Sequence, residues 1–166
     1  MAATFNADEI FEMAEQIERN GARFYRRAAD GIKEPKSHHL LLTLAAMEDE
    51  HLETFAAMRA ELAEGAWDVH FDLDDQAGMY LRAMANGHVF DLKADPAERL
   101  TGKESAEDIL HIAIGLEKDS LVFYQGIREM VPEQSGRGKI DRIITEEMRH
   151  IADMSKELEA LGAGEG

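Results

Sequence analysis

The sequence predicts an all-α protein, a four-helix bundle with a long crossover between helices two and three. Four long segments repeat apolar residues at steps of three and four, which is the spacing of an amphipathic helix. The three prolines fall near the breaks between these segments, and no segment shows the period-two alternation of a strand. A connection of nearly forty residues follows the second segment, and its length allows helices two and three to run parallel.

The four long helices are expected over residues 8–30, 37–64, 105–131 and 139–161. Gly31 and Pro35 are typical of the end of the first helix. Ser37 is a suitable N-cap for the second helix, and Gly65 is a suitable stop after it. The first two helices are therefore separated and ended by residues that favour a boundary.

The connection over residues 66–102 is less regular and is predicted to contain one short helix around residues 76–85. Its apolar residues could cover either the bundle or a partner subunit: Trp67, Phe71, Tyr80, Leu81 and Met84. Residues 162–166 are expected to form a flexible tail. The length fits a single domain over residues 1–166, and a homodimer is expected because two-fold dimers are the commonest assemblies.

Composition excludes several classes of protein. The 34 acidic residues outnumber 18 basic ones, and a net charge of −16 repels phosphate, so we expect neither a nucleic-acid nor a membrane partner. Cysteine is absent, which excludes disulfides, thiol catalysis and iron–sulfur sites. No apolar run reaches 18 residues, and residues 1–8 do not resemble a secretory leader, so a cytoplasmic location is expected. Any metal must be bound by carboxylates and histidines.

Six polar residues interrupt the predicted apolar stripes. Each long helix points at least one carboxylate into the bundle, and two helices add a histidine one turn later. The six residues are Glu18, Glu48, His51, Glu117, Glu147 and His150. A single Glu-x-x-His pair is a weak indication of a site, because chance alone gives about one in a chain of this composition.

The two halves of the chain repeat this pattern. A shift of 99 residues superimposes identical residues: Glu18 on Glu117, Tyr25 on Tyr124, Glu48 on Glu147 and His51 on His150. Most other positions differ, so the identities are concentrated on the predicted interior. A chance motif or a single hydrogen-bonded core histidine does not account for this repetition.

Four carboxylates in an apolar bundle would repel one another and lose hydration unless their charge is balanced. No Lys or Arg occupies the matching stripe positions, whereas two divalent cations would supply four positive charges. One Glu from each of two helices plus Glu-x-x-His from each of the other two is the ligand set of dinuclear carboxylate bundles. The donor types suit iron or manganese, and zinc can enter such sites. The sequence therefore predicts two iron ions, with Mn or Zn as alternatives.

At this point the sequence resembles a known family. Residues 17–25 (IERNGARFY) and 116–124 (LEKDSLVFY) resemble the first and third core helices of the rubrerythrin group of ferritin-like proteins. Residues 48–51 (EDEH) and 147–150 (EMRH) resemble the group's two Glu-x-x-His helices. The similarity covers most of residues 8–161 and is weakest across the connection. It implies a ferritin-like bundle with a dinuclear, usually iron, centre that reacts with peroxide or dioxygen.

The resemblance also implies roles for the six residues: Glu48 and Glu147 bridge both metals, Glu18 and His51 complete one metal, and Glu117 and His150 complete the other. Tyr25 and Tyr124 lie two helical turns after Glu18 and Glu117. We expect these two tyrosines to be core aromatic residues whose hydroxyls are hydrogen-bonded, which is the common role of a buried tyrosine. A hydrogen bond to a metal ligand and a redox role are the other interpretations.

The chain departs from typical rubrerythrins in two ways. It has no cysteine-rich rubredoxin domain, so reductive turnover would require an external electron donor such as a rubredoxin-like protein. It also has Ser120 where typical members carry an extra carboxylate, which leaves a symmetric set of six ligands. The expected function is reduction of hydrogen peroxide or dioxygen at a di-iron centre. A ferroxidase with iron storage in a large oligomer and a metal-free or zinc-filled helical interaction module are the alternatives.

Overall fold

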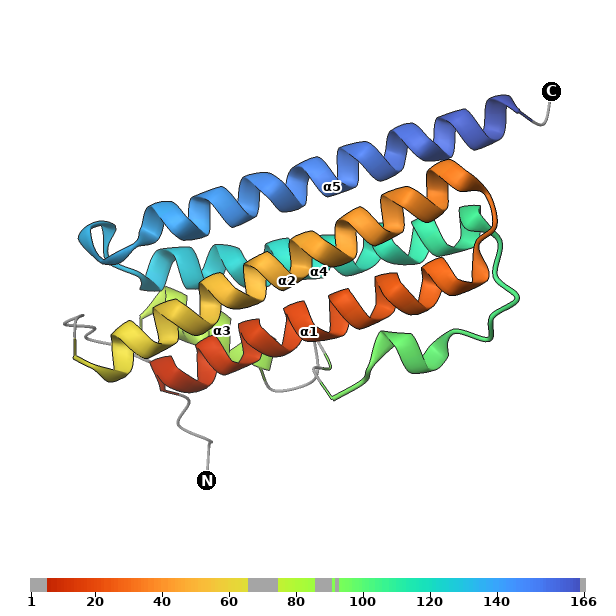
Figure 1. The fold of residues 1–166 in the computed structure, drawn as a ribbon. Helices are drawn as coiled ribbons and strands as arrows, with labels where there is room; N and C mark the ends of the chain where they lie inside the picture. The colour runs from red at the N-terminus through yellow and green to blue at the C-terminus, as the bar shows by residue number, and fades with distance from the viewer. Residues whose placement is uncertain (1–5, 66–74, 86–90, 92, 165–166) are drawn as a thin grey trace.

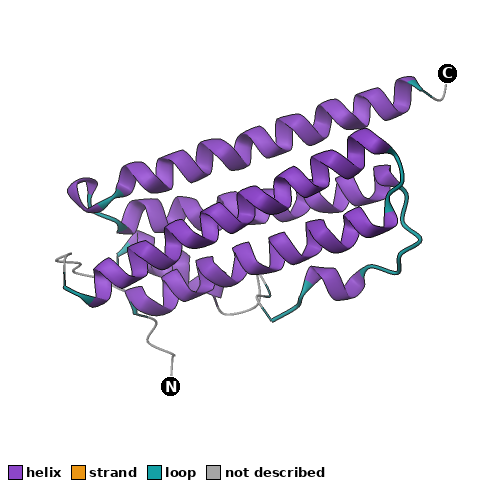
Figure 2. Cartoon of the chain, in the orientation of Figure 1, coloured by secondary structure: helices purple, strands orange, loops and turns teal. Residues whose placement is uncertain are grey.

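Two helical hairpins make up the bundle. The computed structural model describes residues 6–65, 75–85, 91 and 93–164. Helices α1 (Ala7–Gly31) and α2 (Pro35–Ala63) form one antiparallel pair, and α4 (Ala106–Met130) and α5 (Arg137–Ala163) form the other (Figure 1). Helices α2 and α4 run in the same direction, and all regular structure in the described ranges is helical (Figure 2). The predicted all-α bundle with a long crossover is therefore confirmed.

The described part of the crossover packs on the bundle. Helix α3 (Gln76–Ala85) lies against α4, where a side chain in place of Gly126 would come within 2.6 Å of Leu81 Cδ2. Leu81 and Met84 are buried in the core, so these two residues cover the bundle, whereas Tyr80 is partly exposed. The short 3-10 helix η1 (Pro96–Arg99) packs against α1. Trp67 and Phe71 lie outside the described residues.

Three predicted boundaries were wrong. Helix α2 begins at Pro35 because Glu34 is its N-cap, accepting hydrogen bonds from the Lys36 and Ser37 backbone amides, and proline fits the first helical position. Ser37 lies inside the helix, and its hydroxyl donates to Glu157 at 2.8 Å. A second short 3-10 helix, η2 (Glu133–Ser135), leads into α5, which begins at Arg137, two residues before the predicted start, and continues to Ala163. Residues 162–163 are therefore helical, not part of a tail.

The core consists of two apolar clusters, one toward each end of the bundle. The first cluster includes Ile10, Phe11, Phe55, Met58, Phe123, Tyr124, Ile140 and Ile143. The second includes Phe24, Tyr25, Leu41, Leu44, Ile109, Leu110 and Met154. Along every long helix the residues of one cluster give way to those of the other, and the predicted polar positions fall at this change. No helix in the described part of the chain is long and apolar enough to cross a membrane.

Candidate metal centre

The six predicted residues meet in a buried polar layer between the two apolar clusters. Helices α1 and α4 each contribute one glutamate, and α2 and α5 each contribute a Glu-x-x-His pair, whose spacing places both side chains on one helix face. None of the six is more than 3% exposed to solvent. The structure thus brings together every residue proposed as a metal ligand, from segments as far apart in sequence as Glu18 and His150.

These residues form two overlapping groups of four. One group contains Glu18, Glu48, His51 and Glu147, and the other contains Glu48, Glu117, Glu147 and His150. Within each group, one possible ligand atom per residue lies within 4.8 Å of the others. Glu48 and Glu147 belong to both groups, so the arrangement could hold two metal ions with two shared carboxylates.

Both histidines direct Nδ1 toward the shared carboxylates. His51 Nδ1 lies 3.0 Å from Glu147 Oε1 and 3.5 Å from Glu18 Oε2. His150 Nδ1 lies 2.9 Å from the other oxygen of Glu147 and 3.3 Å from Glu117 Oε1. The two rings stack with centroids 5.8 Å apart. Each imidazole therefore offers one nitrogen to one of the two groups.

The outer nitrogens of the two rings have different partners. His51 Nε2 lies 2.9 Å from Glu146 Oε2, whereas His150 Nε2 lies 3.3 Å from the sulfur of Met47. The sequence interpretation missed both partners. They are half-buried residues immediately before Glu147 and Glu48, and a comparison of positions related by the 99-residue shift would have exposed the difference.

The two tyrosines hydrogen-bond across the bundle. The Tyr25 hydroxyl on α1 donates to Glu117 on α4, and the Tyr124 hydroxyl on α4 donates to Glu18 on α1. Burial, together with the nearby carboxylates, raises the pKa of both phenols well above the ordinary value, so the hydroxyls stay protonated and act as donors. Both tyrosines are buried core residues with satisfied hydroxyls, and the partner of each hydroxyl is a candidate metal ligand; a redox role stays a hypothesis.

Comparison with known proteins bears on the fold. The structure is similar to the crystal structure of a candidate ferritin-like diiron-carboxylate protein from Thermotoga maritima. The TM-score is 0.66, and the match covers 93% of this chain and 95% of the other at 19% sequence identity. The bundle has a ferritin-like fold. At this identity the likeness shows the fold alone, and neither a family model nor a curated protein matches the sequence.

Buried atoms without partners mark the interior of the ferritin-like bundle as a place for cations. Among the six residues, no well-oriented hydrogen bond reaches Glu18 Oε2, Glu48 Oε1, His51 Nδ1 or either carboxylate oxygen of Glu147, although the two histidine Nδ1 atoms lie 2.9–3.0 Å from Glu147. Within the described residues no Lys or Arg forms an ion pair with the four glutamates. Buried polar atoms are normally hydrogen-bonded, and isolated buried charges are costly. The residues present therefore fit two divalent cations.

The carboxyl groups respond differently to this environment. Burial raises the pKa of Glu18 and Glu48, and burial together with the charge of Glu147 raises the pKa of Glu117 to about 8. Burial also disfavours the charge of Glu147, but the two adjacent imidazoles outweigh it and hold its pKa below the usual value. Without metal, the four carboxyl groups thus cannot all be ionised at neutral pH.

The imidazoles hold protons for the same reason. Burial alone would lower their pKa values, but the close carboxylates of each group outweigh it and raise the pKa of His51 to about 11 and of His150 to about 9. Protons on histidine and glutamate therefore balance the negative charge in the metal-free protein. Metal ions that bind to these atoms must displace those protons.

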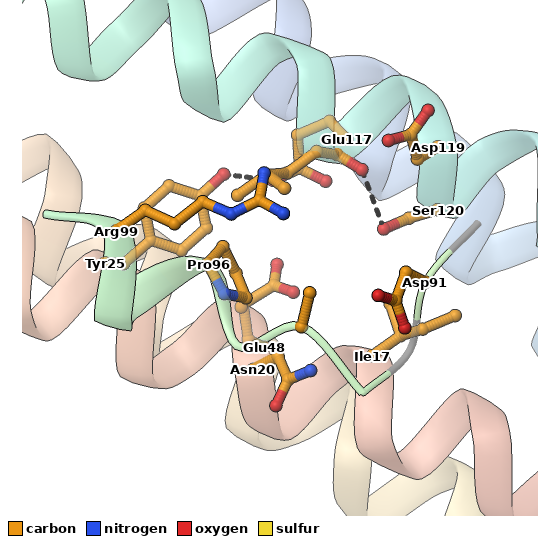
Figure 3. Close-up of a pocket in the computed structure, with 13 residues that line it drawn as sticks. Ile17, Asn20, Tyr25, Glu48, Asp91, Pro96, Arg99, Glu117, Asp119 and Ser120 are labelled. Carbon is orange, nitrogen blue, oxygen red and sulfur yellow. Dashed lines mark hydrogen bonds between the residues drawn. The ribbon is translucent and has the colours of Figure 1, made fainter. Parts of the chain in front are cut away.

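A pocket of about 170 Å³ opens onto one side of the cluster (Figure 3). Glu48, Glu117 and Tyr25 line it together with polar residues from α1, η1 and α4, among them Asn20, Arg99, Asp119 and Ser120. Ser120 does not replace a ligand, since its hydroxyl donates to the Leu116 carbonyl at 3.0 Å. The sequence did not predict this pocket, because it depends on how η1 packs against α1.

Proposed function

We propose that the protein is a di-metal redox protein of the rubrerythrin type, which reduces hydrogen peroxide or dioxygen with electrons from an external donor. The sharing of Glu48 and Glu147 by two buried groups of four is the observation that carries this proposal. The mixed carboxylate and imidazole donors favour iron, with manganese or zinc as alternatives. The diiron-carboxylate description of the Thermotoga maritima protein agrees with this choice.

The residues around the cluster would have distinct tasks. Glu48 and Glu147 would bridge the metals, with Glu18 and His51 completing one position and Glu117 and His150 completing the other. Two ferrous ions, when bound, supply the two electrons that convert one hydrogen peroxide and two protons into two waters. Tyr25 and Tyr124 would hold the terminal carboxylates in place through their hydroxyls. The apolar clusters on either side keep bulk water away from these groups.

The pocket supports a small substrate. Its volume of about 170 Å³ is below the range of roughly 300–1,000 Å³ that is usual for sites binding drug-sized molecules. Glu48 and Glu117 lie on facing walls of the pocket (Figure 3), so a molecule that enters it reaches the shared carboxylate directly. Peroxide and dioxygen fit this space.

The test is oxidation of the ferrous protein. The metal-free protein is loaded anaerobically with two Fe²⁺ per chain and mixed with one equivalent of peroxide or with air-saturated buffer in a stopped-flow spectrometer. We expect visible absorption of the oxidised centre to develop faster with peroxide than with air. A Glu48→Gln/Glu147→Gln variant is the control for unbound iron and should show only the slow oxidation of Fe²⁺ in solution. Equal, slow rates in both proteins would contradict the proposal.

Iron storage is the second candidate, favoured by the net charge of −16, which attracts Fe²⁺. The same centre would then act as a ferroxidase. Particle mass in solution separates the two functions, because storage requires a large hollow assembly and a rubrerythrin-type enzyme does not. We propose a homodimer; a large shell that retains many iron atoms per chain after air oxidation would establish storage instead.

A further inference from the structure

The two halves of the candidate centre differ at one related pair of positions. Met47 and Glu146 are separated by the same 99 residues that relate the halves, both are half-buried, and each contacts the histidine of the opposite hairpin. Glu146 accepts a hydrogen bond from His51 Nε2 at 2.9 Å. Met47 places a thioether 3.3 Å from His150 Nε2. The repeat is therefore symmetric in its six ligands and asymmetric immediately outside them.

The surroundings of Glu146 extend this difference. Arg142 Nε lies 3.0 Å from Glu146 Oε1, so the carboxylate is held between a guanidinium group and His51. The related position on α2 is Thr43, whose hydroxyl donates to the His39 carbonyl instead. An oriented, ionised carboxylate thus supports one imidazole, and a neutral side chain contacts the other.

These contacts have opposite consequences for the two rings. A carboxylate can only accept, so Nε2 of His51 must carry a hydrogen. Nδ1 is then the nitrogen that a metal binds once it has displaced the Nδ1 proton, and the hydrogen bond at Nε2 makes Nδ1 a more basic ligand. A thioether is a weak acceptor and fixes neither the ring's tautomer nor its orientation to the same degree. Removal of such outer partners typically lowers metal affinity by about 10- to 100-fold.

From this difference we infer that the two metal positions are inequivalent: the position of Glu18 and His51 binds its ion more tightly than that of Glu117 and His150. The inference rests on the proposed di-metal function. Glu117 lines the pocket described above, whereas His51 and Glu146 line a separate pocket between α2 and α5, so the inference rests on the outer partners of the two rings and not on access.

Zn²⁺ binding followed by NMR of ¹⁵N-labelled histidine tests this inference. Zn²⁺ is diamagnetic and does not undergo redox chemistry, so the imidazole signals report occupancy of each position independently of any activity. Repulsion between two ions weakens the second binding step in any dinuclear site, but in a symmetric site one equivalent divides evenly between the positions. We expect one equivalent to shift the His51 signals first, with a preference of about 10-fold or more.

A reciprocal exchange provides the decisive variant. In Met47→Glu/Glu146→Met, one equivalent of Zn²⁺ should shift the His150 signals first, and adding Thr43→Arg should strengthen that preference. Two single variants test the inference if the double variant does not fold. Glu146→Gln should lower the Zn²⁺ affinity of the His51 position alone. Met47→Gln, which introduces a neutral acceptor, should raise the Zn²⁺ affinity of the His150 position. The control is Glu50→Gln, which removes an exposed carboxylate next to His51 in the sequence; the described ion pairs of His51 are with Glu18, Glu146 and Glu147.

The outcomes separate this inference from the proposed function. Even division of one equivalent in the native protein, or no change of preference in the exchanged variants, would overturn the inference and leave two-metal binding intact. If Zn²⁺ shifts the signals of neither His51 nor His150, both the inference and the proposed function are overturned, because the centre then does not bind metal.

Discussion

At the scale of single residues, the candidate centre is built from crossed contacts between the two halves of the chain. Each tyrosine hydroxyl donates to the glutamate of the other half, and each histidine ring contacts a residue of the opposite hairpin. These contacts orient the candidate ligands before any metal binds, because each partner is fixed on a separate rigid helix. Removal of one contact should therefore affect one metal position and not the other.

Tyr25→Phe should weaken metal binding at the position of Glu117 and His150 by about tenfold, because it removes the donor that orients Glu117. Tyr124→Phe should weaken the position of Glu18 instead, so each variant is the control for the other. Anaerobic titration with Co²⁺, followed by its visible absorption, measures both positions. Equal losses at both positions, or none, would show that the hydroxyls do not act on individual ligands.

The metal-free protein should become less stable as the pH rises from 6 to 9. A carboxyl whose pKa is raised in the folded state, such as Glu117 at about 8, keeps a proton that the unfolded chain has lost above its ordinary pKa. The raised pKa of His150, about 9, acts in the same direction: its contribution is complete below about 6.5 and is lost as the pH rises through 9. The lowered pKa of Glu147 matters only in acid.

Thermal unfolding in the presence of a chelator measures this dependence. The midpoint temperature of unfolding should decrease as the pH is raised from 6 to 9. Glu117→Gln should make this decrease smaller, because glutamine has no proton to lose. In the metal-loaded protein the stabilisation by metal should instead grow with pH, since binding displaces protons. A midpoint of the metal-free protein that rises over this range would show that the buried carboxyl groups are not protonated as described.

At the scale of the helices, the sequence reveals the candidate ligands because a charged residue inside an apolar stripe breaks the 3.6-residue pattern. Glu18 and Glu117 were predictable in this way. The Glu-x-x-His pairs were predictable as well, because their spacing of one helical turn places both side chains on the same face. Met47 and Glu146 were not predictable, since both polar and apolar side chains are normal at the half-buried edge of a stripe. The start of α2 was missed because Pro35 was interpreted as a breaker and not as a first helical residue.

Close helix packing at Gly21 gives a prediction at this scale. A Cβ at Gly21 on α1 would lie 2.6 Å from Glu48 Oε2, so the carboxylate on α2 would have to move. Gly21→Ala should therefore lower metal affinity at both positions, since both groups contain Glu48. Gly115→Ala is the matched control: Gly115 also lies within a helix, but nothing is within 4 Å of its added Cβ.

The control variant should raise the free energy of unfolding by about 1 kcal/mol through helix propensity alone and leave metal binding unchanged. Chemical denaturation and Co²⁺ titration of both variants provide the comparison. Unchanged metal affinity in Gly21→Ala would mean that Glu48 can shift without affecting the centre.

At the scale of the whole molecule, a polar layer divides the apolar core in two. The two clusters can stabilise the bundle from either side, while in the described part of the chain no Lys or Arg pairs with the carboxylates of the layer between them. The repeat in the sequence predicted this layer, because the identities between the halves lie at its level in all four long helices. The pocket and the packing of α3 were not predictable, since they depend on contacts between the crossover and α1 or α4.

The most direct test of the central claim, that the six residues bind two metal ions, is the metal content per chain measured by mass spectrometry after equilibration with Fe²⁺ under anaerobic conditions. The native protein should retain two ions per chain after desalting, and Glu48→Gln/Glu147→Gln, which neutralises both shared carboxylates without changing their shape, should retain none. A native protein that retains no metal, or a double variant that still retains two ions, would contradict the account.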